Sequence, residues 1–330
     1  MKIKKICTLG PVTLNFKSLK FFNKNADILR YNLSHLSHSK LKFYLKKFKF
    51  INKKICIDTE GAQIRTTKIP KKIFLKKNQK IFIKNENNNS SKNIINLYPE
   101  INFKDVKKNS KIYIGFEGLE LKVTSVKKNY LAAKVVSAGV LDSNKGVHFS
   151  CNVNLDFLTK KDLQCISTAK NYGIKNYALS FTNNHLDVVR FRKLIGKESF
   201  LISKIETKKE IKNIKKILKF SDAILIDRGD LSRYVSVAKI PTAQLKILKI
   251  SNKVNKEVFI ATNLLETMVN SKLPTRAESN DIFFSLISGA SGLVLAAETA
   301  IGKYPIQCLN FINDCIKSFK NYKKNYFSIK

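Results

Sequence analysis

The stretch Ala-Ile-Leu-Ile-Asp-Arg-Gly-Asp, residues Ala223–Asp230, passes from four apolar residues directly into charged ones. Seven other short apolar runs also end at polar or charged residues: Ile6–Gly10, Ile28–Asn32, Ile55–Thr59, Tyr177–Thr182, Phe200–Glu206, Val258–Asn263 and Leu293–Glu298. Between most successive runs, apolar residues recur at helical spacing, as at Leu186, Val189 and Leu194. Eight strands that alternate with helices predict an α/β fold, a closed (β/α)8 parallel TIM barrel.

One connection in this pattern is too long to be a single helix. About a hundred residues separate Arg65 from the helix expected around Leu163. Within this segment apolar and polar residues alternate between turns rich in Asn, Lys and Gly, as at Ile81 and Ile83. We therefore expect a small all-β domain, residues 66–154, inserted after the third strand of a barrel formed by residues 1–65 and 155–330.

The composition gives the chain a strongly basic balance. Its 330 residues include 62 Lys and Arg against 24 Asp and Glu, a formal net charge of +38. Such a charge would ordinarily indicate a nucleic-acid partner. The lysines are scattered over almost every expected helix face and loop, however, without a tight run that alternates with stacking aromatic residues. We expect no specific nucleic-acid binding, and attribute the charge to codon drift or to a surface that attracts anionic substrates.

Cysteine usage and the N-terminus indicate a compartment. The six cysteines are irregularly spaced and form no CxxC pair, which favours free thiols in a reducing environment. The first residues lead straight into the first expected strand without a signal-peptide pattern, and no apolar run approaches the length that spans a membrane. We expect a cytoplasmic protein without a membrane partner.

Charged residues at the strand ends predict a catalytic centre, because the active sites of such barrels lie at the carboxyl ends of the strands. Lys204 and Glu206 are two residues apart on the fifth strand, so their side chains point to the same face. Glu206 and Asp230, from neighbouring strands, are the oxygen ligands that Mg2+ prefers. A lysine beside that metal suits a phosphoryl group in transfer or an enolate, and Thr262 adds a hydroxyl. The alternative interpretation is a solvated ion network at the barrel rim.

Nine motifs in a fixed order give the chain a family resemblance: Cys7–Pro11, Arg30–His35, Asp58–Arg65, Lys145–Val147, Lys204–Glu206, Arg228–Leu231, Ala261–Thr262, Pro274–Glu278 and Glu298–Ala300. By these motifs the chain resembles pyruvate kinases over nearly its whole length. That family also carries a β domain after the third barrel strand. The resemblance implies a glycolytic phosphotransferase that moves the phosphoryl group of phosphoenolpyruvate to ADP, giving pyruvate and ATP.

The resemblance also implies roles for individual residues. Lys204 and Thr262 would be catalytic, and Arg30 would bind the substrate phosphate together with Lys204. Gly229, Asp230 and Thr262 would contact substrate, and Glu206 and Asp230 would hold Mg2+. The expected nucleotide-binding residues are Asn32, His35, Arg65 and Lys145, and the expected K+ site comprises Asn32, Ser34, Asp58 and Thr59. Arg276 and Glu278 are expected to form an ion pair that packs the barrel.

The sequence departs from the family pattern at several positions. Gly115-Phe116-Glu117 and Gly118 replace the paired acidic residues of the inserted domain, and Gln63 replaces the Glu or Lys beside the K+ site, which leaves the K+ requirement open. The motif Ser180-Phe181-Thr182-Asn183 lacks an arginine, and Asp227 stands where a small residue is usual. The sequence stops at Lys330, so we expect the family's C-terminal domain to be absent, with a monomer or homodimer that lacks sugar-phosphate activation.

Other functions stay open at this stage. A degenerate pyruvate kinase homologue could act as a binding protein, although retention of Lys204, Glu206, Asp230 and Thr262 argues against it. A nucleic-acid-binding barrel is suggested by charge alone. A related lyase that acts on a pyruvate enolate would need neither the inserted domain nor Lys145.

Overall fold

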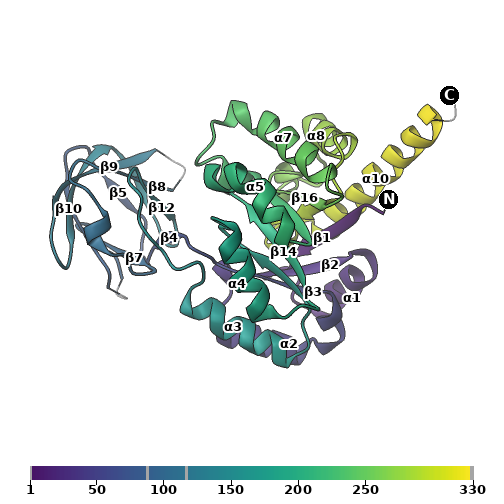
Figure 1. The fold of residues 1–330 in the computed structure, drawn as a ribbon, viewed down its shortest axis with the longest axis horizontal. Helices are drawn as coiled ribbons and strands as arrows, with labels where there is room; N and C mark the ends of the chain where they lie inside the picture. Colours follow the sequence, from purple (N-terminus) through teal and green to yellow (C-terminus); the bar gives the residue numbers. More distant parts are fainter. Residues whose placement is uncertain (1, 87–88, 116–117, 328–330) are drawn as a thin grey trace. The chain divides into compact units, whose positions relative to one another are not determined.

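The computed structural model describes residues 2–86, 89–115 and 118–327 (Figure 1). The chain divides into two compact units, one formed by Met1–Gly61 with Lys160–Lys330 and the other by Ala62–Thr159. The alternation pattern instead set these boundaries at residues 65 and 154. The first boundary differs because Ile64–Thr66 forms strand β4, and both strands that pair with β4 belong to the second unit.

The first unit is a closed barrel of eight strands, in the order β1-β17-β16-β15-β14-β13-β3-β2, and every neighbouring pair is parallel. The strands are β1 (Lys4–Thr8), β2 (Ile28–Asn32), β3 (Ile55–Asp58), β13 (Asn176–Leu179), β14 (Phe200–Ile205), β15 (Ala223–Asp227), β16 (Glu257–Ala261) and β17 (Gly292–Leu295). The prediction of a parallel (β/α)8 barrel is confirmed.

Helices connect and cover these strands (Figure 1). They are α1 (Phe16–Asn25), α2 (His38–Lys47), α3 (Lys160–Asn171), α4 (His185–Ile195), α5 (Lys208–Phe220), α6 (Arg228–Leu231), α7 (Ile240–Asn252), α8 (Arg276–Ile287), α9 (Ala297–Ala300) and α10 (Pro305–Phe327), with short 3-10 turns at Leu33–His35, Lys49–Lys54, Val237–Lys239 and Glu266–Val269. Several begin at a side chain that accepts a hydrogen bond from the first turn, as Asn15 does for α1 and Thr207 for α5. On α5, Ile214, Ile217 and Leu218 are buried and the lysines face outward.

The second unit is an independent β structure with its own apolar core. Its strands are β4 (Ile64–Thr66), β5 (Ile73–Leu75), β6 (Lys80–Lys84), β7 (Ile94–Tyr98), β8 (Lys111–Ile114), β9 (Leu119–Val126), β10 (Leu131–Ser137), β11 (Gly139–Leu141) and β12 (Gly146–Phe149), with a 3-10 turn at Phe103–Asp105. Seven of them close a barrel in the order β10-β6-β7-β4-β12-β8-β9, while β5 and β11 pair separately. On the longer strands buried and outward-facing side chains alternate, with Leu119, Leu121 and Val123 buried on β9.

The cysteines form no disulfide bond among the described residues. All six cysteines are free, and burial raises the pKa of the Cys165 and Cys308 thiols to about 12. Among the described residues, no helix combines the length and apolar character that crossing a bilayer demands.

Glu278 caps α8 and does not form the ion pair expected with Arg276. Its carboxylate accepts hydrogen bonds from Thr267 N at 2.8 Å, Thr267 Oγ1 at 2.6 Å and Thr275 N at 2.7 Å, and the Thr275 hydroxyl caps the helix in return. No ion pair of Arg276 occurs in the part of the chain that the structure describes. Burial would raise the pKa of Glu278, but the hydrogen bonds from Thr267 and Thr275 outweigh it and lower the pKa.

Glu278→Gln should therefore lower the free energy of unfolding near neutral pH by about 1–2 kcal/mol, since it removes charge-assisted hydrogen bonds at a helix N-terminus. The pKa of Glu278 is lower in the folded protein, so its contribution is present above the unfolded pKa and disappears as the pH falls through the folded one. Urea titrations across this range should show the variant and the parent converging below about pH 4. Glu198→Gln, at an exposed position, is the matched control. A constant difference at all pH values would contradict the cap.

Candidate active site

The side chains that point into the barrel change from apolar to polar between one inward-facing position and the next, two residues further along each strand. Inside, the buried core includes Ile6, Ile28, Cys56, Ala178, Ile202 and Leu225 from six different strands. Two residues further along each strand, on the same face, stand Thr8, Arg30, Asp58, Ser180, Lys204 and Asp227. The period of two thus places one polar layer across the carboxyl ends of six strands, which we call the ionic layer.

Lys204 lies at the centre of the ionic layer. Its ammonium is 2.8 Å from Glu206 Oε1, 3.3 Å from Asp227 Oδ2 and 3.5 Å from Asp58 Oδ2, and it donates to Ser180 Oγ at 3.1 Å. Burial would lower the pKa of Lys204, but the neighbouring carboxylates outweigh it and hold the pKa well above its usual value. Lys204 is therefore a permanent cation at neutral pH. With Lys204 4% exposed and Glu206 fully buried, the interpretation as a solvated rim network is wrong.

Arg30 supplies a second buried cation beside Lys204. Its Nε donates to Asp58 Oδ2 at 2.6 Å and its Nη1 donates to Thr8 Oγ1 at 2.9 Å. Asp58 also accepts a hydrogen bond from Ser180 Oγ at 3.1 Å. Asp58 thus links both cations. Arg30 has five N–H donors, of which these two hydrogen bonds use two, and it lines the cavity described below.

Three carboxylates lie close enough to hold one cation. One oxygen each from Glu206, Asp227 and Asp230 falls within 4.8 Å of the others. Burial, together with the repulsion of Asp230 and Asp227, raises the pKa of Glu206 well above its usual value, although Lys204 opposes this. Burial acts in the same direction on Asp227, but Lys204, the Thr262 hydroxyl and Arg30 hold its pKa at about 2. The sequence indicated Glu206 and Asp230 and missed Asp227.

The neighbouring strand end adds Thr262 in an unusual conformation. Its φ of +76° lies in the left-handed region, which is rare for a β-branched residue. Arg228 holds the Thr262 carbonyl with Nε at 3.1 Å and Nη2 at 2.6 Å, while Nη1 of Arg228 pairs with Asp281. The Thr262 hydroxyl donates to Asp227 Oδ1 at 2.6 Å. A Cβ on Gly229 would approach Thr262 Cγ2 to 2.8 Å, so a larger residue here would displace the Thr262 side chain.

A cavity of about 540 Å3 opens above the ionic layer in the first unit. Arg30, Asn32, His35, Asp227 and Thr262 line its polar part. Pro11, Leu14 and Tyr44 are among the residues of its apolar part. The structure thus brings the predicted residues of β2 together with Asp227 and Thr262 around one space.

The remaining predicted residues divide between the two units. Asn32 pairs in register with Asp58 at the ends of β2 and β3, and Ser34 N donates to Asn32 Oδ1 at 3.0 Å. Thr59 Oγ1 accepts a hydrogen bond from Ser180 N at 3.0 Å. These four residues therefore gather in the first unit.

The other predicted or singled-out residues belong to the second unit. Arg65 on β4 pairs in register with Gly146 on β12, which follows Lys145, so Arg65 and Lys145 are neighbours. The buried side-chain amide of Gln63 has no hydrogen-bond partner within the described part of the chain. Phe116 and Glu117 lie outside the described residues.

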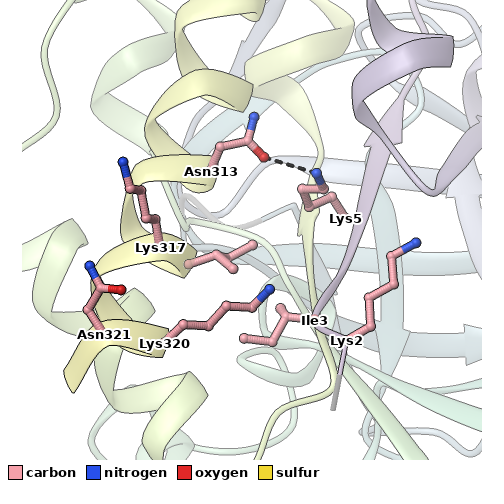
Figure 2. Close-up of a pocket in the computed structure, with 8 residues that line it drawn as sticks. Lys2, Ile3, Lys5, Asn313, Lys317, Lys320 and Asn321 are labelled. Atoms are coloured by element: carbon pink, nitrogen blue, oxygen red, sulfur yellow. Dashed lines mark hydrogen bonds between the residues drawn. The ribbon is translucent and has the colours of Figure 1, made fainter. Parts of the chain in front are cut away.

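Two other hollows in the first unit lie away from the strand ends. One, of about 320 Å3, lies between the N-terminal segment and α10 and is lined by Lys2, Lys5, Lys317 and Lys320. Figure 2 shows that their ammonium groups point in different directions instead of toward one point. The other, of about 800 Å3, lies between α5 and α7 and is bordered by exposed lysines. Neither contains a buried charged cluster like that around Lys204.

The chain is similar to known proteins over most of its length. The family model "Pyruvate kinase, barrel domain" matches residues 1–309. Pyruvate kinase of Thermotoga maritima is 30% identical over 326 residues, which cover 95% of this chain and 70% of that protein. Pyruvate kinase of Buchnera aphidicola subsp. Schizaphis graminum is 34% identical over 323 residues, covering 92% and 67%. That of Chlamydia pneumoniae is 30% identical over 340 residues, covering 99% and 70%. The chain belongs to the pyruvate kinase family.

Proposed function

We propose that this chain catalyses phosphoryl transfer from phosphoenolpyruvate to ADP, giving pyruvate and ATP in glycolysis. The observation that carries the proposal is the buried, permanently charged Lys204 at the strand ends, with Arg30 beside it beneath an open cavity. Phosphoryl transfer is catalysed chiefly by positioning and by fixed positive charge directed at the transferring group. A centre with two buried cations meets this requirement.

The side chains of the ionic layer divide the work between them. Arg30 binds the substrate phosphate, and Lys204 stabilises the negative charge that passes from the phosphoryl oxygens to the enolate. Because its pKa is raised, Lys204 acts as a cation and not as a base. Thr262, whose proton is directed at Asp227 Oδ1, presents its hydroxyl oxygen at the substrate end of the layer together with Gly229.

The cavity accommodates the nucleotide in this proposal. Tyr44, Pro11 and Leu14 offer an apolar surface for a planar base, and Asn32 and His35 line the same cavity. From the family resemblance, Arg65 and Lys145 contact the nucleotide phosphates. Within the second unit the two residues are neighbours, Arg65 on β4 and Lys145 directly before β12.

The residues present fit the two metal ions of the family. For Mg2+, Glu206 and Asp230 supply carboxylates, and the fully buried Glu206 Oε1 makes no hydrogen bond of suitable geometry although Lys204 is 2.8 Å away. Mg2+ would supply charge neutralisation at the phosphoryl oxygens. For K+, Asn32, Ser34, Asp58 and Thr59 offer an all-oxygen set on adjacent strand ends.

A coupled assay of pyruvate formation from phosphoenolpyruvate and ADP tests the proposal. We expect turnover with Mg2+ and K+ present. Lys204→Met should reduce kcat by about 10² to 10³ or more, because it removes a charge directed at the transition state. Lys212→Met, at an exposed position on α5, should match the parent. A folded parent without turnover would support the alternative of a degenerate, ligand-binding homologue, and a Lys204→Met variant within a few-fold of the parent would contradict the assignment of Lys204.

Glu206→Gln and Asp230→Asn should each raise the Mg2+ concentration for half-maximal activity by about tenfold or more, since each removes an anionic ligand. Initial rates over a Mg2+ titration provide the measurement. Unchanged half-saturation in both variants would place the metal elsewhere.

Replacement of K+ by tetramethylammonium at constant ionic strength should reduce the rate, because the bulky cation cannot enter the oxygen set of Asn32, Ser34, Asp58 and Thr59. The assay compares the two chloride salts. Equal rates would show that turnover needs no monovalent ion at this site.

A further inference from the structure

We propose that Asp227 is a third carboxylate ligand of the divalent cation, so that this chain binds the ion before substrate arrives. The inference rests on the proposed function for the metal's role, but it concerns a residue to which the family resemblance assigns nothing. With two carboxylates, a Mg2+ site depends on substrate oxygens to complete its coordination. A third carboxylate raises the number of anionic protein ligands and hence the affinity of the substrate-free protein.

The direction of Asp227 follows from the strand that carries it. Leu225 on β15 points into the barrel core, so Asp227, two residues further on, points into the ionic layer. Asp230 reaches the same place from the short helix α6. Together with Glu206 they provide three oxygens within 4.8 Å of one another, a spacing that a single ion can bridge.

The hydrogen bonding leaves oxygens available for an ion. Asp227 Oδ1 accepts from Thr262 Oγ1, whereas Asp227 Oδ2 has only a longer contact of 3.3 Å with Lys204. Glu206 Oε2 accepts from Phe181 N at 2.6 Å. Glu206 Oε1 is completely buried, has the Lys204 ammonium 2.8 Å away and makes no hydrogen bond of suitable geometry. Because the single charge of Lys204 is shared with Asp227 and Asp58, a second cation would stabilise this buried oxygen further.

The charges around the centre also leave room for one divalent ion. The cations are Arg30, Lys204 and Arg233, and the carboxylates are Asp58, Glu206, Glu210, Asp227 and Asp230, while Arg228 and Asp281 form a separate pair. The carboxylates outnumber the cations by five to three, and a bound divalent cation would offset the repulsion among them.

The competing interpretation makes Asp227 only a counter-ion of Lys204. Lys204 already has Glu206 at 2.8 Å, Ser180 at 3.1 Å and Asp58 at 3.5 Å, so its charge is paired without Asp227. The two interpretations differ in what the loss of Asp227 does to metal affinity. Loss of a ligand removes a coordinating oxygen as well as a nearby charge, whereas loss of a counter-ion removes the charge alone, so the decrease in affinity is larger in the first case.

Mn2+ binding to the substrate-free full chain, measured by electron paramagnetic resonance of free Mn2+, separates these interpretations. We expect one Mn2+ per chain in the parent and an affinity about tenfold or more lower in Asp227→Asn. Asp314→Asn, which makes the same charge change at an exposed position on α10, should match the parent. Asp227→Ser provides a second variant, and circular dichroism checks that each one is folded. An affinity within twofold of the parent in the folded Asp227 variants would overturn the proposal.

The failure of this inference is distinguishable from failure of the proposed function. If the parent forms no pyruvate but Asp227→Asn still lowers its Mn2+ affinity, the third ligand is supported and the proposed reaction is wrong. If the parent forms pyruvate and its Mn2+ affinity does not depend on Asp227, the reaction is supported and the third ligand is wrong.

Discussion

The Lys204 ammonium is charged and buried, and the arrangement of the barrel's carboxyl end depends on pairing that charge with carboxylates and hydrogen-bond acceptors. Glu206, Asp227, Asp58 and Ser180 surround it, each from a strand end or just beyond one. The cost of burying an ion is repaid only when every partner is in place, and removal of one partner from a buried pair costs about 3–5 kcal/mol. Register between parallel strands is therefore a condition for function as well as for the fold.

Supporting contacts keep these strand ends in position. The carboxylate of Glu210 accepts hydrogen bonds from the Glu206 and Thr207 amides, which joins the end of β14 to the first turn of α5. Burial raises the pKa of Glu210 to about 7 in spite of these hydrogen bonds. On the adjacent strands, Arg228 holds the carbonyl of Thr262 in its left-handed conformation. The ion pair between Arg228 and Asp281 thus supports the strained backbone of Thr262.

Much of this architecture could be predicted because it follows from residue periodicity. Apolar runs that end at charged residues predicted the eight barrel strands. Alternation of apolar and polar residues after Arg65 predicted the inserted β domain. The same period of two could have shown that Asp227 points inward, since it follows Leu225 as Lys204 follows Ile202. The conformation of Thr262 and the cap formed by Glu278 could not be predicted, because they depend on contacts with Arg228 and Thr267 that are distant along the chain.

In the proposed metal site, one divalent cation binds among the carboxylates of Glu206, Asp227 and Asp230. Anomalous diffraction from crystals soaked in Mn2+ tests it directly. We expect a single strong peak within about 2.0–2.5 Å of oxygens from Glu206, Asp227 and Asp230, with the Asp227 carboxylate turned from Lys204 toward the ion. A peak elsewhere, or a peak held by Glu206 and Asp230 while Asp227 remains on Lys204, would contradict it.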